Sequence, residues 1–207
     1  AREELGAEGV DVNERGEEGR SPLYVACEKG SVGLVNVLLA ADGTDPNQAR
    51  GKSAEDKYTG STPLLIACWG GFVKVVSALL QAEGIDVNRA KKDGSTPLDA
   101  ACYSGHLDIV RMLLGVDGID PNLALSNGCT PLIIASYLGR ADVVELLLGD
   151  CGPRCDASLE CAGKSALEWA ESAVRHPDPT WSFLDAMISE DGRARVRGLC
   201  SKGNQGV

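Results

Sequence analysis

The sequence predicts an all-α fold, a solenoid of helix-turn-helix-loop units of about 34 residues stacked in one elongated domain. Two markers recur in phase along the 207 residues and predict this architecture. One is a hydroxyl residue followed by proline and leucine, and the other is an Asp-x-Asn triplet. Aromatic residues make up only 4% of the chain, which suits thin, closely packed helices better than a spherical core.

The first marker predicts where each unit begins. A hydroxyl oxygen accepts a hydrogen bond from a free amide at a helix N-terminus, and proline at the first helical position has no amide to leave unpaired. We therefore expect a first helix to start after each occurrence, with a degraded fifth copy. The occurrences are Ser21-Pro22-Leu23, Thr62-Pro63-Leu64, Thr96-Pro97-Leu98, Thr130-Pro131-Leu132 and Ser165-Ala166-Leu167.

Glycine and an apolar stripe define the rest of the unit. Gly30, Gly71, Gly105 and Gly139 recur where the first helix should end, because a left-handed residue lets the chain reverse there. The second helix then runs antiparallel and carries an apolar stripe, as in 75–80. Two short helices cannot bury such a stripe alone, so neighbouring units must stack.

Together these motifs resemble the ankyrin repeat. The shared pattern runs Thr-Pro-Leu, Ala-Ala, Gly-His, Val-Val, Leu-Leu and Gly-x-Asp-x-Asn, with Gly105-His106 as the full Gly-His pair. The resemblance implies repeats at about 14–47, 48–88, 89–122, 123–158 and 159–192. Residues 1–13 are expected to be the end of a truncated or eroded repeat, and 193–207 a disordered basic tail.

The edges of the stack carry further expectations. Leu5–Asn13 matches Leu80–Asn88 position for position, which indicates that the chain begins inside a repeat. In the last unit we expect helices over Ala166–Val174 and Trp181–Ile188, with acidic residues forming a polar cap. The finger that contains Gly51–Lys57 is seven residues longer than its counterparts. It is interpreted either as neutral drift or as a binding insertion.

Charge and hydropathy exclude some classes of partner. The formal net charge of −10 and a pI near 4.7 argue against nucleic-acid binding. No apolar run is long enough for a membrane span. We therefore expect an intracellular, cytoplasmic or nuclear, monomeric protein that binds neither nucleic acid nor membranes and needs no cofactor.

The sequence offers little for catalysis. Only His106 and His176 are available as catalytic bases, and His106 lies in the Gly-His turn. Gly51-Lys52-Ser53 and Gly163-Lys164-Ser165 resemble the end of a phosphate-binding loop, but the first glycine of that motif is missing from both. We expect no enzyme activity.

Eight cysteines raise the question of metal binding or disulfides. Cys27, Cys68 and Cys102 share one position in the first helix and are expected to be reduced core residues. Cys151, Cys155 and Cys161 lie in one irregular loop, and we expect free thiols there. Two alternatives stay open. One is zinc with His176, Cys129 or Cys200 as the fourth ligand, and the other is a disulfide from Cys151 to Cys155 or Cys161.

The resemblance also implies where a partner binds, namely the concave groove made by finger tips and the ends of the first helices. Two residues before the recurrent glycine stand Trp69, Tyr103 and Tyr137, which we expect to form an aromatic row along this groove. The alternative is that these rings pack sideways onto neighbouring repeats. The other candidate contacts are Glu17, Glu18, Arg20, Glu28, Lys29, Tyr58, Lys92, Asp93, Ser95, Asn127 and Leu138.

Two functions fit these expectations. The first is a protein-interaction scaffold or adaptor whose groove binds a partner protein or peptide. The second is a regulatory or targeting arm of a larger protein, such as an enzyme, whose active domain is absent from this chain.

Overall fold

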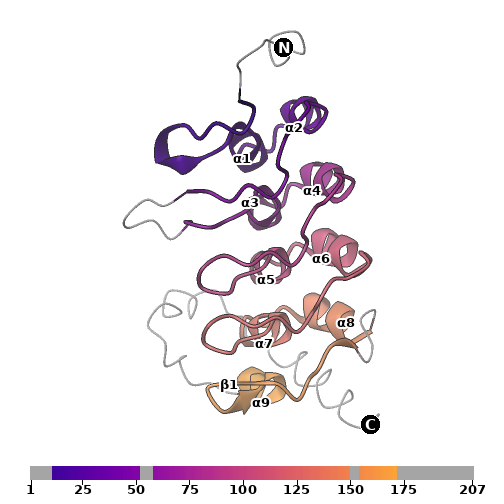
Figure 1. Ribbon diagram of the computed structural model, residues 1–207. Coiled ribbons are helices and arrows are strands. Elements are labelled where there is room, and N and C mark those ends of the chain that lie inside the picture. The colour runs from indigo at the N-terminus through magenta and orange to yellow at the C-terminus, as the bar shows by residue number, and fades with distance from the viewer. Residues whose placement is uncertain (1–10, 52–57, 150–153, 172–207) are drawn as a thin grey trace.

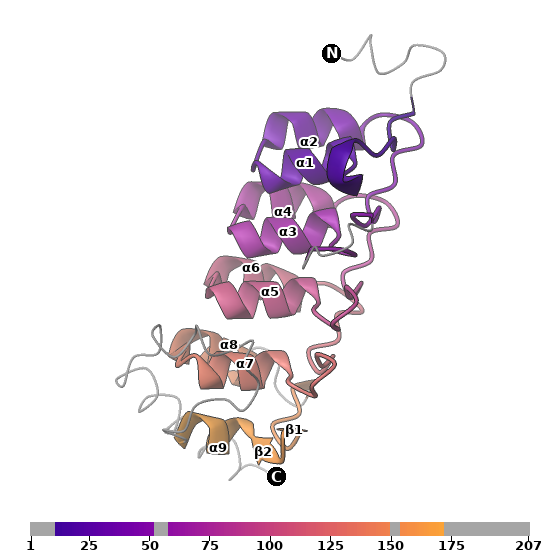
Figure 2. The same cartoon turned by 90° about the vertical axis from the view of Figure 1, so that its left-hand side faces the viewer.

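The computed structural model describes residues 11–51, 58–149 and 154–171. Figure 1 shows two rows of short helices, with the fingers projecting from the side of the first helices. The first helices are α1 (Pro22–Glu28), α3 (Pro63–Gly70), α5 (Pro97–Ser104), α7 (Pro131–Tyr137) and α9 (Ala166–Glu171). The second helices are α2 (Val32–Leu39), α4 (Val73–Leu80), α6 (Leu107–Leu114) and α8 (Ala141–Gly149). Figure 2 shows the same pairs stacked along one axis, so the predicted all-α solenoid is confirmed.

The hydroxyl-proline marker starts the first helices as predicted. The side chains of Ser21, Thr62 and Thr130 each accept a hydrogen bond from the backbone amide three residues later, at 3.2, 3.1 and 3.4 Å. Thr96 forms a capping box, because its hydroxyl accepts from the amide of Asp99 and its own amide donates to the Asp99 carboxylate. Proline occupies the first helical position of all four helices.

The glycine that ends the first helix is required by both backbone and packing. Gly71 follows α3 with a φ of 73°, in the left-handed region that favours glycine. A Cβ atom placed on Gly71 would lie 2.6 Å from the imidazole of His106 in the next repeat. The turn therefore leaves room for the neighbouring unit only because no side chain is present.

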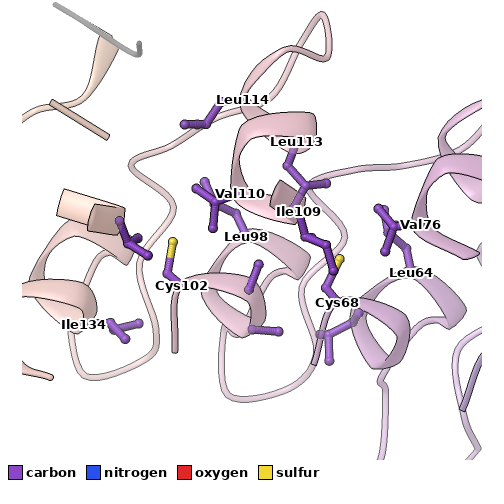
Figure 3. Packing of buried hydrophobic residues seen from close by; sticks show 14 of the residues in the cluster. Leu64, Cys68, Val76, Leu98, Cys102, Ile109, Val110, Leu113, Leu114 and Ile134 are labelled. Carbon is purple, nitrogen blue, oxygen red and sulfur yellow. The ribbon is translucent and has the colours of Figure 1, made fainter. Parts of the chain in front are cut away.

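The core runs along the stack between the two rows of helices. Cys27, Cys68, Cys102 and Ser136 share one slot of the first helix, and each is fully buried. Burial raises the pKa of the Cys27 thiol to about 12. Figure 3 shows Cys68 and Cys102 among the aliphatic side chains of α3 to α6. The prediction that these cysteines are core residues is confirmed.

Asparagine side chains tie each loop to the next. Asn13 Nδ2 donates to the carbonyl of Gly43 at 2.7 Å, while Asn13 Oδ1 accepts from the amide of Asp45 at 2.9 Å. Asp11 Oδ1 accepts from the backbone amide of Asn13 and closes its own turn. The same pattern recurs at Asn47, Asn88 and Asn122. The Asp-x-Asn triplets therefore have a structural role, and the asparagine also links successive repeats.

A small antiparallel hairpin precedes α9. Strands β1 (Glu160–Cys161) and β2 (Lys164–Ser165) pair Glu160 with Ser165 and Cys161 with Lys164. The sequence did not predict it, because two-residue strands leave no periodic signal. The hairpin occupies the position of a finger and lies next to α9.

The outward side of the first repeat differs from those of the later repeats. Leu34 in α2 is 54% exposed, whereas Val75 and Ile109, the third residues of α4 and α6, are fully buried. Val143 at the same position of α8 is 3% exposed. The preceding repeat covers this face in α4, α6 and α8, while no described residue covers it in α2. The apolar stacking face of α2 is therefore not covered by any residue in the described ranges.

Several predictions concern residues outside the described ranges. These are the match at Leu5, the long finger over 52–57, the second helix of the last unit and the basic tail. Of the helix expected over Ala166–Val174, the structure describes Ala166–Glu171 as α9. No helix within the described residues is both long and apolar enough to cross a bilayer.

Candidate protein-binding surface

Two stacked aromatic rings lie at the ends of α3 and α5. Trp69 is 43% exposed, and its ring stacks on that of Tyr103 in the next repeat. The ring centroids are 4.9 Å apart and the planes differ by 19°. Both residues lie in the row of first helices from which the fingers project. We call the exposed ends of the first helices together with the fingers the inner surface.

Polar contacts from the following repeats hold this pair in place. Ser104 Oγ donates to the carbonyl of Trp69 at 3.2 Å, and His106 Nε2 lies 3.3 Å from the same oxygen. One repeat further on, Arg140 donates to the carbonyl of Tyr103 at 3.4 Å. Partial burial raises the pKa of the Tyr103 hydroxyl, so Tyr103 stays protonated at neutral pH. The supporting roles of His106 and Arg140 leave no signal in the sequence, because each contact joins residues more than 30 positions apart.

The third ring of the expected aromatic row is not on the surface. Tyr137 is 1% exposed and meets the ring of Trp169 edge to face, with centroids 5.6 Å apart. Trp169 belongs to α9 and covers the end of α7. The expectation of a three-membered row was therefore wrong, and Tyr137 packs onto the neighbouring repeat instead. Leu138 is buried as well, at 5% exposure.

The candidate residues near the first repeat form a charged cluster. Arg20 donates to Glu28 at 2.9 Å and lies 3.3 Å from Glu18, and Arg50 donates to the same Glu18 oxygen at 2.8 Å. The Arg50 guanidinium lies 5.8 Å from the centroid of the Tyr58 ring. These contacts connect the first two fingers. They leave the carboxylate of Glu18 half exposed, since its side chain is 56% accessible.

The remaining candidates are spread over the first repeat and the later fingers. Asp93 accepts from Lys91 at 2.7 Å and from the amide of Ser95 at 2.9 Å. Burial acts to raise the pKa of Asp93, but these hydrogen bonds together outweigh it and bring the pKa below its ordinary value. Asn127 accepts from the amide of Cys129 at 3.0 Å. The exposed charges nearby include Lys29 and Lys92, and Glu17 begins the short 3-10 turn Glu17–Gly19.

Cys161 pairs with a cysteine outside its own loop, which is not one of the disulfides proposed from the sequence. Cys161 forms a disulfide with Cys129, with the two Cα atoms 4.8 Å apart. Sequence spacing within one loop could not indicate this partner, because the bond joins fingers of successive repeats. Cys155 is buried, and Cys151 lies outside the described residues. No group of three or more His, Cys, Asp or Glu side chains in the described ranges is arranged to hold a metal ion.

Comparison with protein families agrees with this geometry. Residues 48–124 match a model of three ankyrin repeats, and residues 18–51 and 127–159 each match a model of a single ankyrin repeat. The chain belongs to the ankyrin repeat family. A search of curated proteins found no match. Ankyrin repeats are in general protein-protein interaction modules, and ankyrin domains are typically non-catalytic.

Proposed function

We propose that this ankyrin stack is an adaptor that holds a segment of a partner protein against the inner surface, with Trp69 and Tyr103 at the centre of the contact. A contact of standard size would bury on the order of 1,600 Å² in total. Such an area requires several repeats, so the partner segment would extend from the charged first fingers past α5. The mixed charges at Glu18, Lys29 and Lys92 would then form a polar rim around the aromatic pair.

The exposure of Trp69 is the observation that carries this proposal. Large aromatic side chains stabilise a fold when buried, and Trp169, Tyr24 and Tyr137 are all at most 1% exposed. Trp69 is the one aromatic among the exposed large hydrophobic residues of the described chain. Tryptophan and tyrosine are also the residues most enriched at binding hot spots.

The fixed orientation of the pair adds support. Tyr103 covers one face of the Trp69 ring, and contacts to the carbonyl of Trp69 hold its backbone. A ring that is already immobilised loses less conformational entropy when a partner binds. The pair therefore offers a flat, preorganised apolar contact, which suits an extended or helical protein segment.

The experiment is affinity capture from a lysate of the source organism with three matched baits. The first bait is the unmodified chain, and the second is a Trp69→Ala, Tyr103→Ala double variant. The third is a control, Lys74→Ala, Asp108→Ala, which changes exposed residues in the second helices α4 and α6. The proposal expects a protein retained by the first and third baits and lost from the second. Equal capture by all three baits, with equal thermal stability, would refute it.

The exposed Leu34 on the stacking face of α2 favours a second candidate, in which the stack is a targeting arm that docks onto another part of a larger protein. The exposed Leu34 carries this candidate, because later repeats use the same position for stacking. A Leu34→Glu bait separates the two candidates. It would keep a partner bound at Trp69 and lose one bound on α2.

A further inference from the structure

The disulfide between Cys129 and Cys161 fastens the last described repeat to the stack. Cys129 immediately precedes Thr130, the N-cap of α7, and Cys161 lies in β1 just ahead of α9. The two residues are 32 positions apart, so the bond connects successive repeats. Their side chains are 0% and 1% exposed. Both sulfur atoms are therefore sealed between the two fingers.

The bond is part of a larger cluster that holds α9 on α7. Trp169 Nε1 donates to the carbonyl of Cys161 at 3.0 Å, while its ring packs edge-on against Tyr137. Lys164, which pairs with Cys161 in the hairpin, places its ammonium 4.7 Å from the centroid of the Trp169 ring. Movement of Cys161 would disturb the position of Trp169 directly.

The other described fingers are joined without covalent bonds. The amide of Gly51 donates to the carbonyl of Gly19 at 2.8 Å, and the amide of Ser126 donates to the carbonyl of Asp93 at 2.8 Å. Among the described residues, the disulfide occurs only at the junction with α9. The structure describes α9 over Ala166–Glu171, where it packs against α7. The disulfide therefore adds a covalent link to this contact between successive repeats.

The remaining core cysteines are poor sites for thiol chemistry. Burial raises the pKa of Cys27 to about 12 and raises that of Cys68 as well, and the thiolate is the reactive form. The Cys129–Cys161 pair is different because it is already oxidised and can accept electrons from a dithiol.

We propose that Cys129–Cys161 is a reversible redox modification site whose reduction releases α9 from α7. The substrate class is a dithiol reductant. Its thiolate attacks one cysteine sulfur, which breaks the Cys–Cys bond and forms a mixed disulfide. The second thiol of the reductant then displaces that cysteine. The reductant leaves as a disulfide, and the two electrons and two protons remain on the protein as two thiols.

Reduction would change the surface as well as the stability. Both sulfurs are buried, so exchange must follow local opening of the hairpin. Once α9 separates, Trp169 no longer covers Tyr137, which stands at the same position of its repeat as Trp69 and Tyr103. Resting on the proposed function, this would add a third ring to the inner surface.

The test is hydrogen exchange followed by mass spectrometry on the full chain, with and without dithiothreitol. Peptide mapping of the untreated chain is expected to find residues 129 and 161 cross-linked. Amides of residues 160–171 are expected to exchange at least about tenfold faster after reduction, while α3 stays protected. A Cys129→Ser, Cys161→Ser variant should exchange like the reduced chain and ignore dithiothreitol. A Cys68→Ala variant is the control and should still respond.

Two results would overturn the proposal. One is the absence of a 129–161 cross-link after oxidation in air, and the other is unchanged exchange over 160–171 on reduction. Neither readout involves a partner. The experiment can therefore refute the redox site without refuting partner binding at the inner surface, and the reverse also holds.

Discussion

The pair Trp69–Tyr103 and the pair Tyr137–Trp169 are built from the same two residue types, yet one is a partly exposed stack and the other a buried edge-to-face contact. Trp69, Tyr103 and Tyr137 all stand two residues before the glycine that ends a first helix. Their exposure differs because of the next repeat. Trp169 is the fourth residue after Ser165. The equivalent residue, four positions after Thr96, is Ala100. The small Ala100 has no ring with which to cover the preceding repeat.

This difference teaches that the repeat pattern gives a residue its place but the neighbouring repeat decides whether it is buried. The same holds for apolar positions outside the aromatic pairs. Leu34 and Val75 occupy one position of the repeat, and only Val75 has a described neighbour that covers it. The predictions below test this dependence on neighbours, from the largest expected effect to the smallest.

Removal of the buried ring should have the largest effect. Trp169→Ala is expected to lower the free energy of unfolding of the last repeat by about 3–5 kcal/mol, because it leaves a cavity and removes the cover of Tyr137. Trp69→Ala should change the free energy of unfolding by less than about 1 kcal/mol, since its ring is already 43% exposed. Urea unfolding measures both values. Equal losses in the two variants would contradict the comparison.

The free energy of unfolding should depend on pH through Asp99, which lies in α5, the helix that carries Tyr103. Burial raises the pKa of Asp99 from 3.8 to about 7, and the hydrogen bonds from Thr96 only partly oppose this. The folded chain therefore holds this proton more tightly than the unfolded chain. This contribution to the free energy of unfolding is complete below about pH 4 and is lost as the pH rises to about 7, with an effect on the order of 4 kcal/mol.

Asp99→Asn isolates that contribution, because the amide stays neutral and its oxygen can still accept from Thr96. The difference in unfolding free energy between variant and unmodified chain should therefore grow from pH 4.5 to pH 7.5, in favour of the variant. Urea titrations at the two pH values measure it. Parallel pH profiles would show that Asp99 does not titrate in this range.

Stacking positions should show the smallest effect where no neighbour covers them. Leu34→Ala is expected to lower the free energy of unfolding by less than about 1 kcal/mol, and Val75→Ala by about 2 kcal/mol although it removes fewer carbon atoms. Thermal unfolding of both variants gives the comparison. A larger loss for Leu34→Ala would mean that α2 is covered in solution.

The sequence predicts features that depend on one repeat and misses those that depend on two. Helix starts at Thr62 and Thr96 followed from local chemistry, and so did the buried slot of Cys68. The burial of Tyr137 and the bond between Cys129 and Cys161 could not be read from spacing along one loop. Both arise where residues of one repeat meet an atypical partner in the next.

The most direct measurement of the binding account is the affinity of a captured partner for the unmodified chain, Trp69→Ala and Lys74→Ala, determined by isothermal titration calorimetry. We predict that Trp69→Ala weakens binding by about 2 kcal/mol or more, roughly 30-fold, and that Lys74→Ala binds like the unmodified chain. Full affinity in a folded Trp69→Ala variant would contradict the central role of the exposed aromatic pair.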